Sequence, residues 1–431
     1  MSAHLWQWLV LAATLILLGY LGWKKPHALV FVLAAAVALE ISRTWYPALG
    51  SLGKALGTVD LARLTTLAII ITAAAYLVVS AEKRQLLGVA LRRPLTWSLL
   101  LYIGLGAGSM LYSVDKQATA VEVVRLFILL LLCLSIVVIS RKQDVLVPLQ
   151  VVHAVGLLLL PLTIYEVLTK HFVWQQFLAT VNPPRVNATF VDPNIFARYL
   201  VLAIVANVVL QYLADTKGQR IFYLGALLGL ITELAVTLSR SGMVTVVLVL
   251  GLMLLLKPEK RVLKPIGLVA ILGVLLAIIH PTVWQRILTF GQGMQALDPQ
   301  RLYLWRVAGA MFHDHPILGV GMGGFQKSFL THYLKLKTIS NGVTLSHTTI
   351  LTIAAELGVL GLAVLAAIWI LLSKFMWGLR SAGRRTYILG IGYFLWILTV
   401  FISSQAEARF FEDPVMWLAI GMLFTVQRVY N

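Results

Sequence analysis

The sequence has few charged residues and a single cysteine. Asp, Glu, Lys and Arg make up only 12% of its 431 residues, while 60% are hydrophobic. Soluble globular domains carry about twice as much charge, and no water-soluble fold of this size could bury so much apolar surface. Lipid must therefore be the solvent for most of the chain. Because the one cysteine, Cys133, lies inside an apolar run, disulfide frameworks and cysteine-based metal sites are excluded.

Acidic residues are especially scarce. There are 17 Asp and Glu against 35 Lys and Arg, which gives a formal net charge of +18. In a soluble protein this excess would indicate binding to nucleic acid. In a membrane protein, the preference of Lys and Arg for cytoplasmic loops is the simpler explanation, so no nucleic-acid partner is expected.

Apolar runs recur along the whole chain and can cross a hydrocarbon layer of about 30 Å as helices. The first run is too long for the apolar region of a signal peptide and lacks its positive start, so we interpret it as a span. The sequence thus predicts an all-α, polytopic transmembrane helical bundle, one domain over residues 1–431 with twelve or thirteen spans. These are expected near residues 5–23, 27–42, 64–81, 95–113, 120–140, 145–167, 194–213, 219–238, 242–256, 264–280, 347–373, 386–404 and 414–427.

Lys and Arg gather on alternate loops, which are therefore expected in the cytoplasm. The intervening loops, including the two longest at 169–193 and 281–346, are then expected on the outer face. Strict alternation also places the N-terminus outside, unless one of the first two runs does not span. The cytoplasmic assignment rests on Lys24, Lys25, Lys83, Arg84, Arg92, Arg93, Arg141, Lys142, Lys217, Arg220, Lys257, Lys260, Arg261, Lys264, Lys374, Arg380, Arg384, Arg385 and Arg428.

The outward loop 281–346 is too long for a plain connector. Residues 301–312 have helical periodicity, and a second amphipathic stretch covers 325–336. Between them, the PILGVGMGGF segment carries glycines that favour tight turns and close approach of the backbone to a ligand. The loop is therefore predicted to be partly helical.

Several ionisable residues lie in this loop or at the outer ends of spans, where such groups usually mark a site or a buried pair. Guanidinium groups bind phosphate oxygens in a planar, two-pronged way, and histidine can take up a proton near neutral pH. Together they suit a site for a pyrophosphate or another polyanion. The candidates are Arg185, Arg240, Arg301, Arg306, His347 and Glu356.

Structural interpretations of the same residues stand beside this one. A single Arg near a span end is more often an interfacial anchor than a ligand contact, and a His at a helix start is ordinarily a polar cap. Glu356 is nine helical steps from His347 and therefore on the opposite face. Trp305 shares a face with Arg301, and packing of the loop helix is the role that we favour for it.

Metal and nucleotide chemistry are not expected. His313, Asp314 and His315 look like a metal site, but no third ligand cluster stands nearby. The chain has no DxD motif, P-loop or GxSxG elbow, and GVGMGG lacks the strand–helix setting of a dinucleotide site. No cofactor is therefore predicted, and an already activated donor would supply the energy of any transfer.

The run RLYLW…PILGVGMGGF…SHTTILTIAAELGVLG resembles the shared domain of the O-antigen ligase and polymerase superfamily. That family typically has an Arg-x-x-x-Trp helix, a PxxGxGxGxF turn, and a His that opens a helix continuing to Glu-x-Gly. The upstream LSRSG and RVNATFVDPN segments are also similar, so the resemblance covers residues 180–365, the ligase/polymerase core region. One departure is Thr348 after His347, where many members have Asn.

The resemblance implies a glycosyltransferase of the bacterial inner membrane whose site faces the periplasm, with 281–346 as a periplasmic loop. It would use an undecaprenyl-pyrophosphate-linked glycan without metal or nucleotide. Length and layout fit best the ligase that transfers this glycan to a sugar hydroxyl of lipid A–core. The related protein O-oligosaccharyltransferases usually carry a C-terminal extension, whereas this sequence stops at Asn431.

Two alternatives stay open. The O-antigen polymerase, or a related polyprenyl-linked glycan transferase, is not separated from the ligase by these motifs. A secondary transporter fits the hydropathy, although transporters tend to place charges at the bilayer midplane in two related halves.

In the implied reaction, Arg185, Arg240 and Arg301 would hold the donor diphosphate and stabilise the leaving pyrophosphate. His347 would accept the proton of the acceptor hydroxyl, and direct displacement would invert the anomeric configuration. Membrane lipids are a further partner. Supporting or substrate-binding roles are expected for Trp305, Arg306 and Glu356, with Glu356 as a structural partner inside the bundle.

Overall fold

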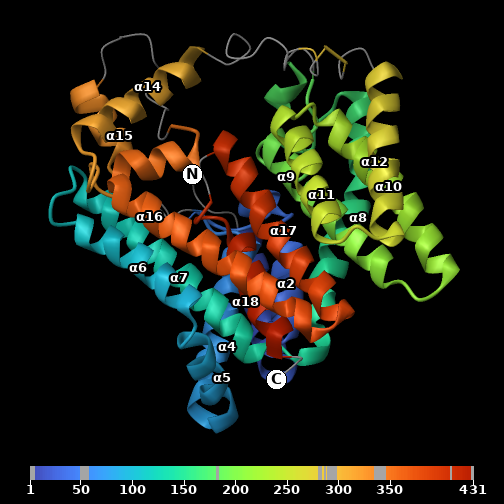
Figure 1. Cartoon of the computed structure of the whole chain (residues 1–431), viewed down its shortest axis with the longest axis horizontal. Helices are drawn as coiled ribbons and strands as arrows, with labels where there is room; N and C mark the ends of the chain where they lie inside the picture. The colour runs from blue at the N-terminus through green and yellow to red at the C-terminus, as the bar shows by residue number, and fades with distance from the viewer. Residues whose placement is uncertain are drawn as a thin grey trace.

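The computed structural model describes residues 5–48, 58–180, 184–279, 284–285, 288, 299–333, 346–407 and 410–428. Across these ranges the regular structure is helical and contains no strand, so the all-α prediction is confirmed (Figure 1). The expected helical residues 334–336, at the end of the second amphipathic stretch, lie outside the described residues.

Eight helical segments are long and apolar enough to cross a membrane, which makes this a multi-pass helical membrane protein. Two further helices, α5 (Ala81–Leu91) and α6 (Pro94–Ser109), bend by 72° at their junction and together form a ninth candidate. The eight segments contain α1 (Leu5–Lys24), α4 (Leu61–Val79), α7 (Lys116–Ile139), α8 (Val147–Thr169), α9 (Pro193–Leu213), α10 (Lys217–Val236), α16 (Thr349–Gly378) and α17 (Arg384–Glu407).

Three of the remaining expected spans form helices shorter than 18 residues, and the fourth forms a helix of 20 residues, α12 (Lys260–Ile279), that is not among these eight. The three shorter helices are α2 (Ala28–Ala36), α11 (Arg240–Leu256) and α18 (Pro414–Arg428). Among the described residues, length and composition therefore support eight or nine spans, fewer than the twelve or thirteen expected.

Helix α2 illustrates the physical reason for the difference. A helix of nine residues covers only about 14 Å of a hydrocarbon layer of about 30 Å. The apolar run continues to residue 42, but the chain leaves the helix and forms the 3₁₀ turn η1 (Glu40–Thr44). There the Glu40 carboxylate accepts a hydrogen bond from the Val191 amide at 2.8 Å, so a tertiary contact holds this turn.

Several helices begin where the sequence supplies capping groups. The Asp60 carboxylate accepts from the Arg63 amide at the start of α4, and Asp115 does the same for Ala118 in α7. Pro193 occupies the first turn of α9, where a missing N–H costs nothing. These capping groups mark where α4, α7 and α9 begin.

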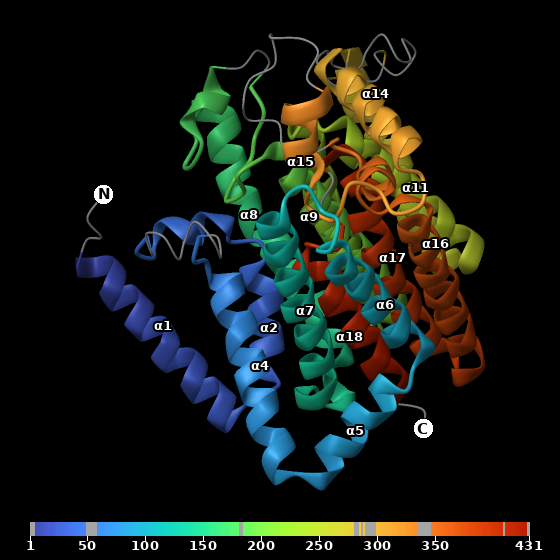
Figure 2. The same ribbon diagram turned by 90° about the vertical axis from the view of Figure 1, so that its left-hand side faces the viewer.

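Helices α9, α17 and α18 form the buried centre of the bundle, and α1 lies at its edge with most of its surface exposed (Figure 2). Without a strong hydrophobic force between helices in lipid, close packing depends on small residues. A Cβ at Gly242 of α11 would lie 2.7 Å from Ala197 Cβ of α9, so only glycine allows this approach.

The bundle has two ends. The described part of the long loop forms α14 (Pro299–Asp314), α15 (Phe325–Ser328) and the π turn η5 (Phe329–Tyr333) at one end, and α5 lies at the other (Figures 1 and 2). We name these ends the α14 face and the α5 face. Gln7 of α1 donates to Thr44 O at 3.2 Å, and the Ile41 amide donates to Thr189 O at 3.0 Å. The start of α1 therefore lies near η1 and the loop before α9.

Candidate functional site

Arg185 links the start of α9 to the end of α10. Its Nε donates to Thr237 O at 3.1 Å, and its Nη2 donates to Asn194 Oδ1 at 2.8 Å. Thr237 and Asn194 are neutral, so these two bonds orient the guanidinium without cancelling its charge. Asn194 Oδ1 also accepts from Ser239 Oγ at 2.8 Å, which brings Arg185 close to the residue that precedes Arg240.

Arg240 is the first residue of α11. The turn before it contains Leu238 with a φ of +51° and ends at Ser239, whose hydroxyl caps the helix by accepting from the Gly242 amide at 3.2 Å. The N-terminus of a helix carries partial positive charge and attracts anions. A cation at this position is unfavourable by itself, and a bound anion would relieve the repulsion.

His347 lies just before α16 and has a φ of +57°, a left-handed conformation that non-glycine residues rarely adopt. Both of its neighbours are held by hydrogen bonds. Ser346 Oγ donates to Thr348 O at 2.9 Å and contacts Thr352 Oγ1 at 2.8 Å, and the Thr348 amide donates back to Ser346 Oγ at 3.2 Å. This frame holds His347 in a conformation that it would not choose in an isolated chain.

Helix α14 contacts the same segment through Arg301 and Trp305. Trp305 Nε1 donates to Thr348 Oγ1 at 2.8 Å, and Thr348 Oγ1 donates to Gln405 O at 3.1 Å. Arg301 Nη2 donates to Ala406 O at 3.1 Å. The two side chains, one helical turn apart, thus both reach the place where the start of α16 packs against the end of α17.

The end of α17 connects the two groups of candidates. Ser403 Oγ lies 3.5 Å from Thr245 Oγ1 of α11, and Glu407 forms an ion pair with Arg198 of α9 at 2.9 Å. The end of α17 therefore contacts α9 and α11 through one set of residues and the start of α16 and α14 through another. The tertiary structure brings Arg185 close to the start of α11, where Arg240 lies, and brings Arg301 and Trp305 to the segment of His347.

Two predicted residues lie elsewhere. Arg306 is exposed on α14. Glu356 is buried in α16, about 14 Å along the helix axis from His347 at 1.5 Å per residue. Its Oε1 accepts from the Phe325 amide at 3.3 Å, and the Gly323 amide also binds the carboxyl group. Glu356 thus contacts the glycine-rich turn and α15.

The PILGVGMGGF segment forms the expected tight turn, with positive φ at Gly319, Gly321 and Gly323. The expectation of a ligand at its backbone needs correction, because the close neighbour of Gly319 is the protein itself. A Cβ there would lie 2.2 Å from the Glu356 carbonyl carbon, and the Gly321 amide donates to Glu356 O at 2.9 Å. Glycine is required because two backbone segments meet.

A buried ion triad was not predicted. Arg198 of α9 binds Glu407 at the end of α17 and Asp413 before α18, each at 2.9 Å, and only 9% of Arg198 is exposed. Opposite charges near span ends indicate buried pairs. The acidic residues of the FFEDP segment and the Arg of PNIFAR are therefore the sequence signal from which this ion triad could have been predicted. Because both carboxylates neutralise it, Arg198 is a structural cation.

The HDH segment is held by contacts within the loop. Asp314 Oδ2 accepts from the Tyr333 hydroxyl at 2.8 Å, and Oδ1 lies 3.3 Å from His313 Nδ1. Partial burial and Asp314 raise the pKa of Tyr333 to about 12, so this hydroxyl remains a donor at neutral pH. Among the residues that the structure describes, no three His, Cys, Asp or Glu side chains are grouped so as to hold a metal ion.

Comparison with known proteins identifies one family. Residues 224–366 match the sequence model of the family described as O-antigen ligase. This stretch runs from α10 into α16 and contains Arg240, Arg301 and His347, whereas Arg185 lies before it. No curated protein sequence matches the chain.

Proposed function

We propose, from the match of residues 224–366 to the O-antigen ligase family, that this chain is an O-antigen ligase. The family match and the apolar helices together describe a multi-pass membrane protein with a domain of the O-antigen ligase and polymerase type. The proposed reaction transfers a glycan from undecaprenyl pyrophosphate to a sugar hydroxyl of lipid A–core, at the periplasmic face of the bacterial inner membrane.

The observation that carries this proposal is that Arg301 and Trp305 of α14 both bond to groups at the junction of α17 with the segment that contains His347. Arg185, Arg240 and Arg301 would bind the donor diphosphate, with the polyprenyl chain between the helices. Two hydrogen bonds orient the Arg185 guanidinium, which can bind phosphate oxygens in a planar, two-pronged way. Arg240 stands at a helix N-terminus, where anions bind favourably. As the glycosidic bond to the diphosphate breaks, negative charge grows on the leaving oxygen, and fixed cations stabilise that charge most effectively.

His347 would act as the general base. The acceptor hydroxyl oxygen attacks the anomeric carbon, its proton passes to the imidazole, and undecaprenyl pyrophosphate leaves from the opposite side. A single displacement of this kind inverts the anomeric configuration. The left-handed conformation of His347 supports such a role, because strained residues persist where the surroundings hold them and are frequent at active sites.

The first test is the variant His347→Ala in a strain that lacks the chromosomal gene. Loss of a general base lowers such rates by about 100-fold or more, so we expect the gel ladder of long-chain lipopolysaccharide to disappear while the protein stays in the membrane. His313→Ala is the matched control, since the His313 side chain is 89% exposed in the outer loop. Normal ladders from His347→Ala would remove the general-base role.

The same deletion strain distinguishes the rival functions. Accumulation of polymer on the lipid carrier, with none on lipid A–core, indicates the ligase. Lipid A–core that carries a single repeat unit indicates the polymerase, which would use the same donor chemistry with another acceptor. Unchanged glycans with altered solute uptake would indicate a secondary transporter.

A further inference from the structure

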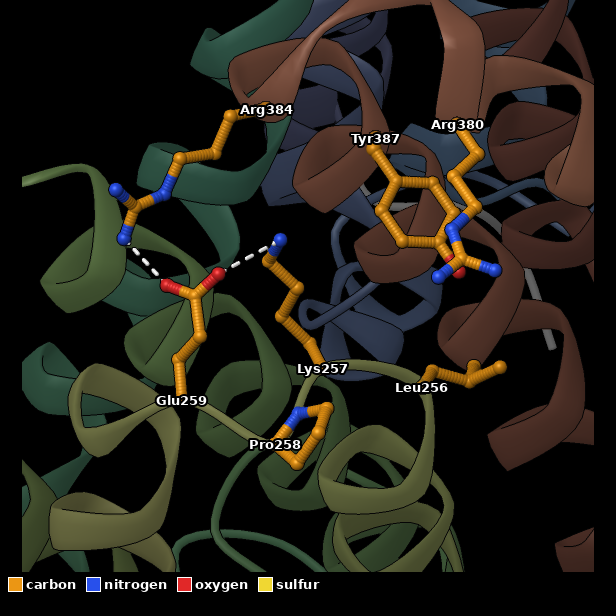
Figure 3. Close-up of a pocket in the computed structure, with 7 residues that line it drawn as sticks. All are labelled: Leu256, Lys257, Pro258, Glu259, Arg380, Arg384 and Tyr387. Carbon is orange, nitrogen blue, oxygen red and sulfur yellow. Dashed lines mark hydrogen bonds and ion pairs between the residues drawn. The ribbon is translucent and has the colours of Figure 1, made fainter.

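A pocket lies at the opposite end of α11 from Arg240, about 25 Å away along a helix of 17 residues. It has a volume of about 420 Å³ and opens between the turn that joins α11 to α12 and the start of α17, next to the 3₁₀ turn η6 (Leu379–Ala382). Its lining is formed by Leu256, Lys257, Pro258, Glu259, Arg380, Arg384 and Tyr387 (Figure 3). It is therefore separate from the candidate active site.

The pocket has an excess of positive charge. Three cationic side chains, Lys257, Arg380 and Arg384, face one carboxylate, that of Glu259. Glu259 binds Lys257 at 2.8 Å and also Arg384, as Figure 3 shows. One carboxylate cannot neutralise three cations, so two positive charges remain. Arg380 packs its guanidinium over the ring of Trp377, 5.0 Å from the centroid.

Tyr387 adds a buried polar group that a ligand could satisfy. Only 4% of this residue is exposed, and within the described residues its hydroxyl is buried without a hydrogen-bond partner. Lys257 Nζ lies 5.9 Å from the centre of its ring. A buried hydroxyl without a partner is costly, and an oxygen-rich anion in the pocket would provide an acceptor beside the cations.

The surroundings of the pocket indicate the kind of anion. Leu255, Leu263 and Trp377, which flank it in the chain, are 80%, 52% and 53% exposed. Exposed apolar side chains at helix ends face lipid, and Trp is typical of the membrane interface. A ligand here would thus meet a basic pocket and an apolar wall together, which is the arrangement that suits a phospholipid.

We propose that this pocket binds the phosphate-bearing headgroup of an anionic phospholipid. The phosphate lies among Lys257, Arg380 and the Tyr387 hydroxyl, and the acyl chains follow Leu255 and Leu263. By the distribution of Lys and Arg, this end of α11 faces the cytoplasm, where the anionic leaflet attracts clustered cations. The lipid would tie the turn between α11 and α12 to the start of α17.

The test uses the full-length protein purified in detergent, with lipid binding measured by native mass spectrometry. Dioleoyl phosphatidylglycerol should bind, and dioleoyl phosphatidylcholine should bind at least tenfold more weakly. Arg380→Gln should weaken phosphatidylglycerol binding about fivefold, the effect of one cation near an anionic surface, and Tyr387→Phe should weaken it by about two- to fivefold. Tyr387→Phe keeps the ring, so it remains informative if Arg380→Gln fails to fold.

Arg92→Gln is the matched control, because Arg92 is an exposed cation at the end of α5 and its loss changes the net charge equally. It should bind phosphatidylglycerol as the unmodified protein does. If Arg92→Gln and Arg380→Gln weaken phosphatidylglycerol binding equally, the proposed binding site is wrong. If inorganic phosphate, at the same concentration as the lipid, displaces phosphatidylglycerol, the pocket binds a soluble anion and the proposal of a lipid ligand is wrong.

Discussion

At the scale of single residues, Arg240 places a guanidinium group at the N-terminus of α11. A cation at the first position of α11 opposes the helix dipole, and the charge distribution along the chain would not have placed one on this face. Arg198, by contrast, has two carboxylates against it. The two carboxylates identify Arg198 as a residue of the fold.

We therefore expect Arg240→Lys to impair glycan transfer by about tenfold or more, because the loss of one charge-assisted hydrogen bond costs about 1.5–3 kcal/mol. An ammonium keeps the charge but lacks the planar fork that matches a diphosphate. Transfer is measured with purified donor and acceptor in detergent. Arg92→Lys, at an exposed position, should leave the rate of glycan transfer unchanged. Full activity in Arg240→Lys would argue against bidentate binding of the diphosphate.

The bond from Trp305 to Thr348 is the second residue-scale feature, since Thr348 adjoins His347. Trp305→Phe removes this bond and Thr348→Val removes both it and the bond to Gln405 O. A hydrogen bond contributes about 1 kcal/mol, so we expect each variant to lower kcat about fivefold or more, with little change in KM.

A double-mutant cycle shows whether the two residues act as one unit. The double variant should lose little more than Thr348→Val alone, because both substitutions remove the same bond. Thr232→Val serves as the control, since Thr232 bonds only within its own helix, to Leu228 O. Fully additive losses would contradict a shared role in positioning His347.

At the scale of elements, the helix α16 is interrupted at Gly358, and this break has two structural consequences. Gly358 has a non-helical conformation with a φ of +61°, and the Val359 amide donates to Pro316 O at 2.8 Å instead of to its own helix. The break therefore gives the outer loop a backbone partner within the bundle. The N-terminal part of α16 follows His347, so the break also fixes the distance between that residue and the glycine-rich turn.

Gly358→Ala should destabilise the protein strongly. A Cβ at this position would lie 2.4 Å from the Ile317 carbonyl carbon, and the backbone conformation, with φ +61° and ψ −155°, is essentially limited to glycine and costs other residues about 1–3 kcal/mol. Thermal unfolding followed by fluorescence-detected size exclusion measures the effect. Gly378→Ala, in the same helix with open space around it, should be neutral or stabilise by up to about 1 kcal/mol.

At the scale of the whole molecule, the triad of Arg198, Glu407 and Asp413 joins the helices of the buried centre. It links α9 to the end of α17 and to the start of α18. The carboxylates, once buried, depend on their cation, because an unpaired buried charge is costly. The triad therefore ties the end of α17 that adjoins the candidate site to the core of the bundle.

Arg198→Met should lower stability by about 3–5 kcal/mol, the cost of breaking a buried ion pair, and reduce the amount of folded protein in membranes. The control Arg63→Met breaks an exposed pair with Asp60, which is 3.5 Å away, and should cost less than about 1 kcal/mol. If both variants unfold at the same temperature, the triad does not stabilise the bundle.

The sequence alone determined that lipid surrounds most of the protein, which class of fold it has, and which motifs it carries. Apolar content and run length are local properties, so they predicted a helical membrane protein and the long helices correctly, and the motif order led to the family that the match at residues 224–366 supports. The helix with Arg301 and Trp305 was also predictable, because periodicity within 16 residues encodes it.

Only the tertiary structure decided which of these segments meet. Arg185 binds a carbonyl group 52 residues away, and Arg301 binds one 105 residues away. Such contacts depend on how helices pack, which no local pattern encodes. For the same reason, the sequence did not show that α2 stops after nine residues, that Arg198 is neutralised by two carboxylates, or that glycines at the turn make room for the protein's own backbone.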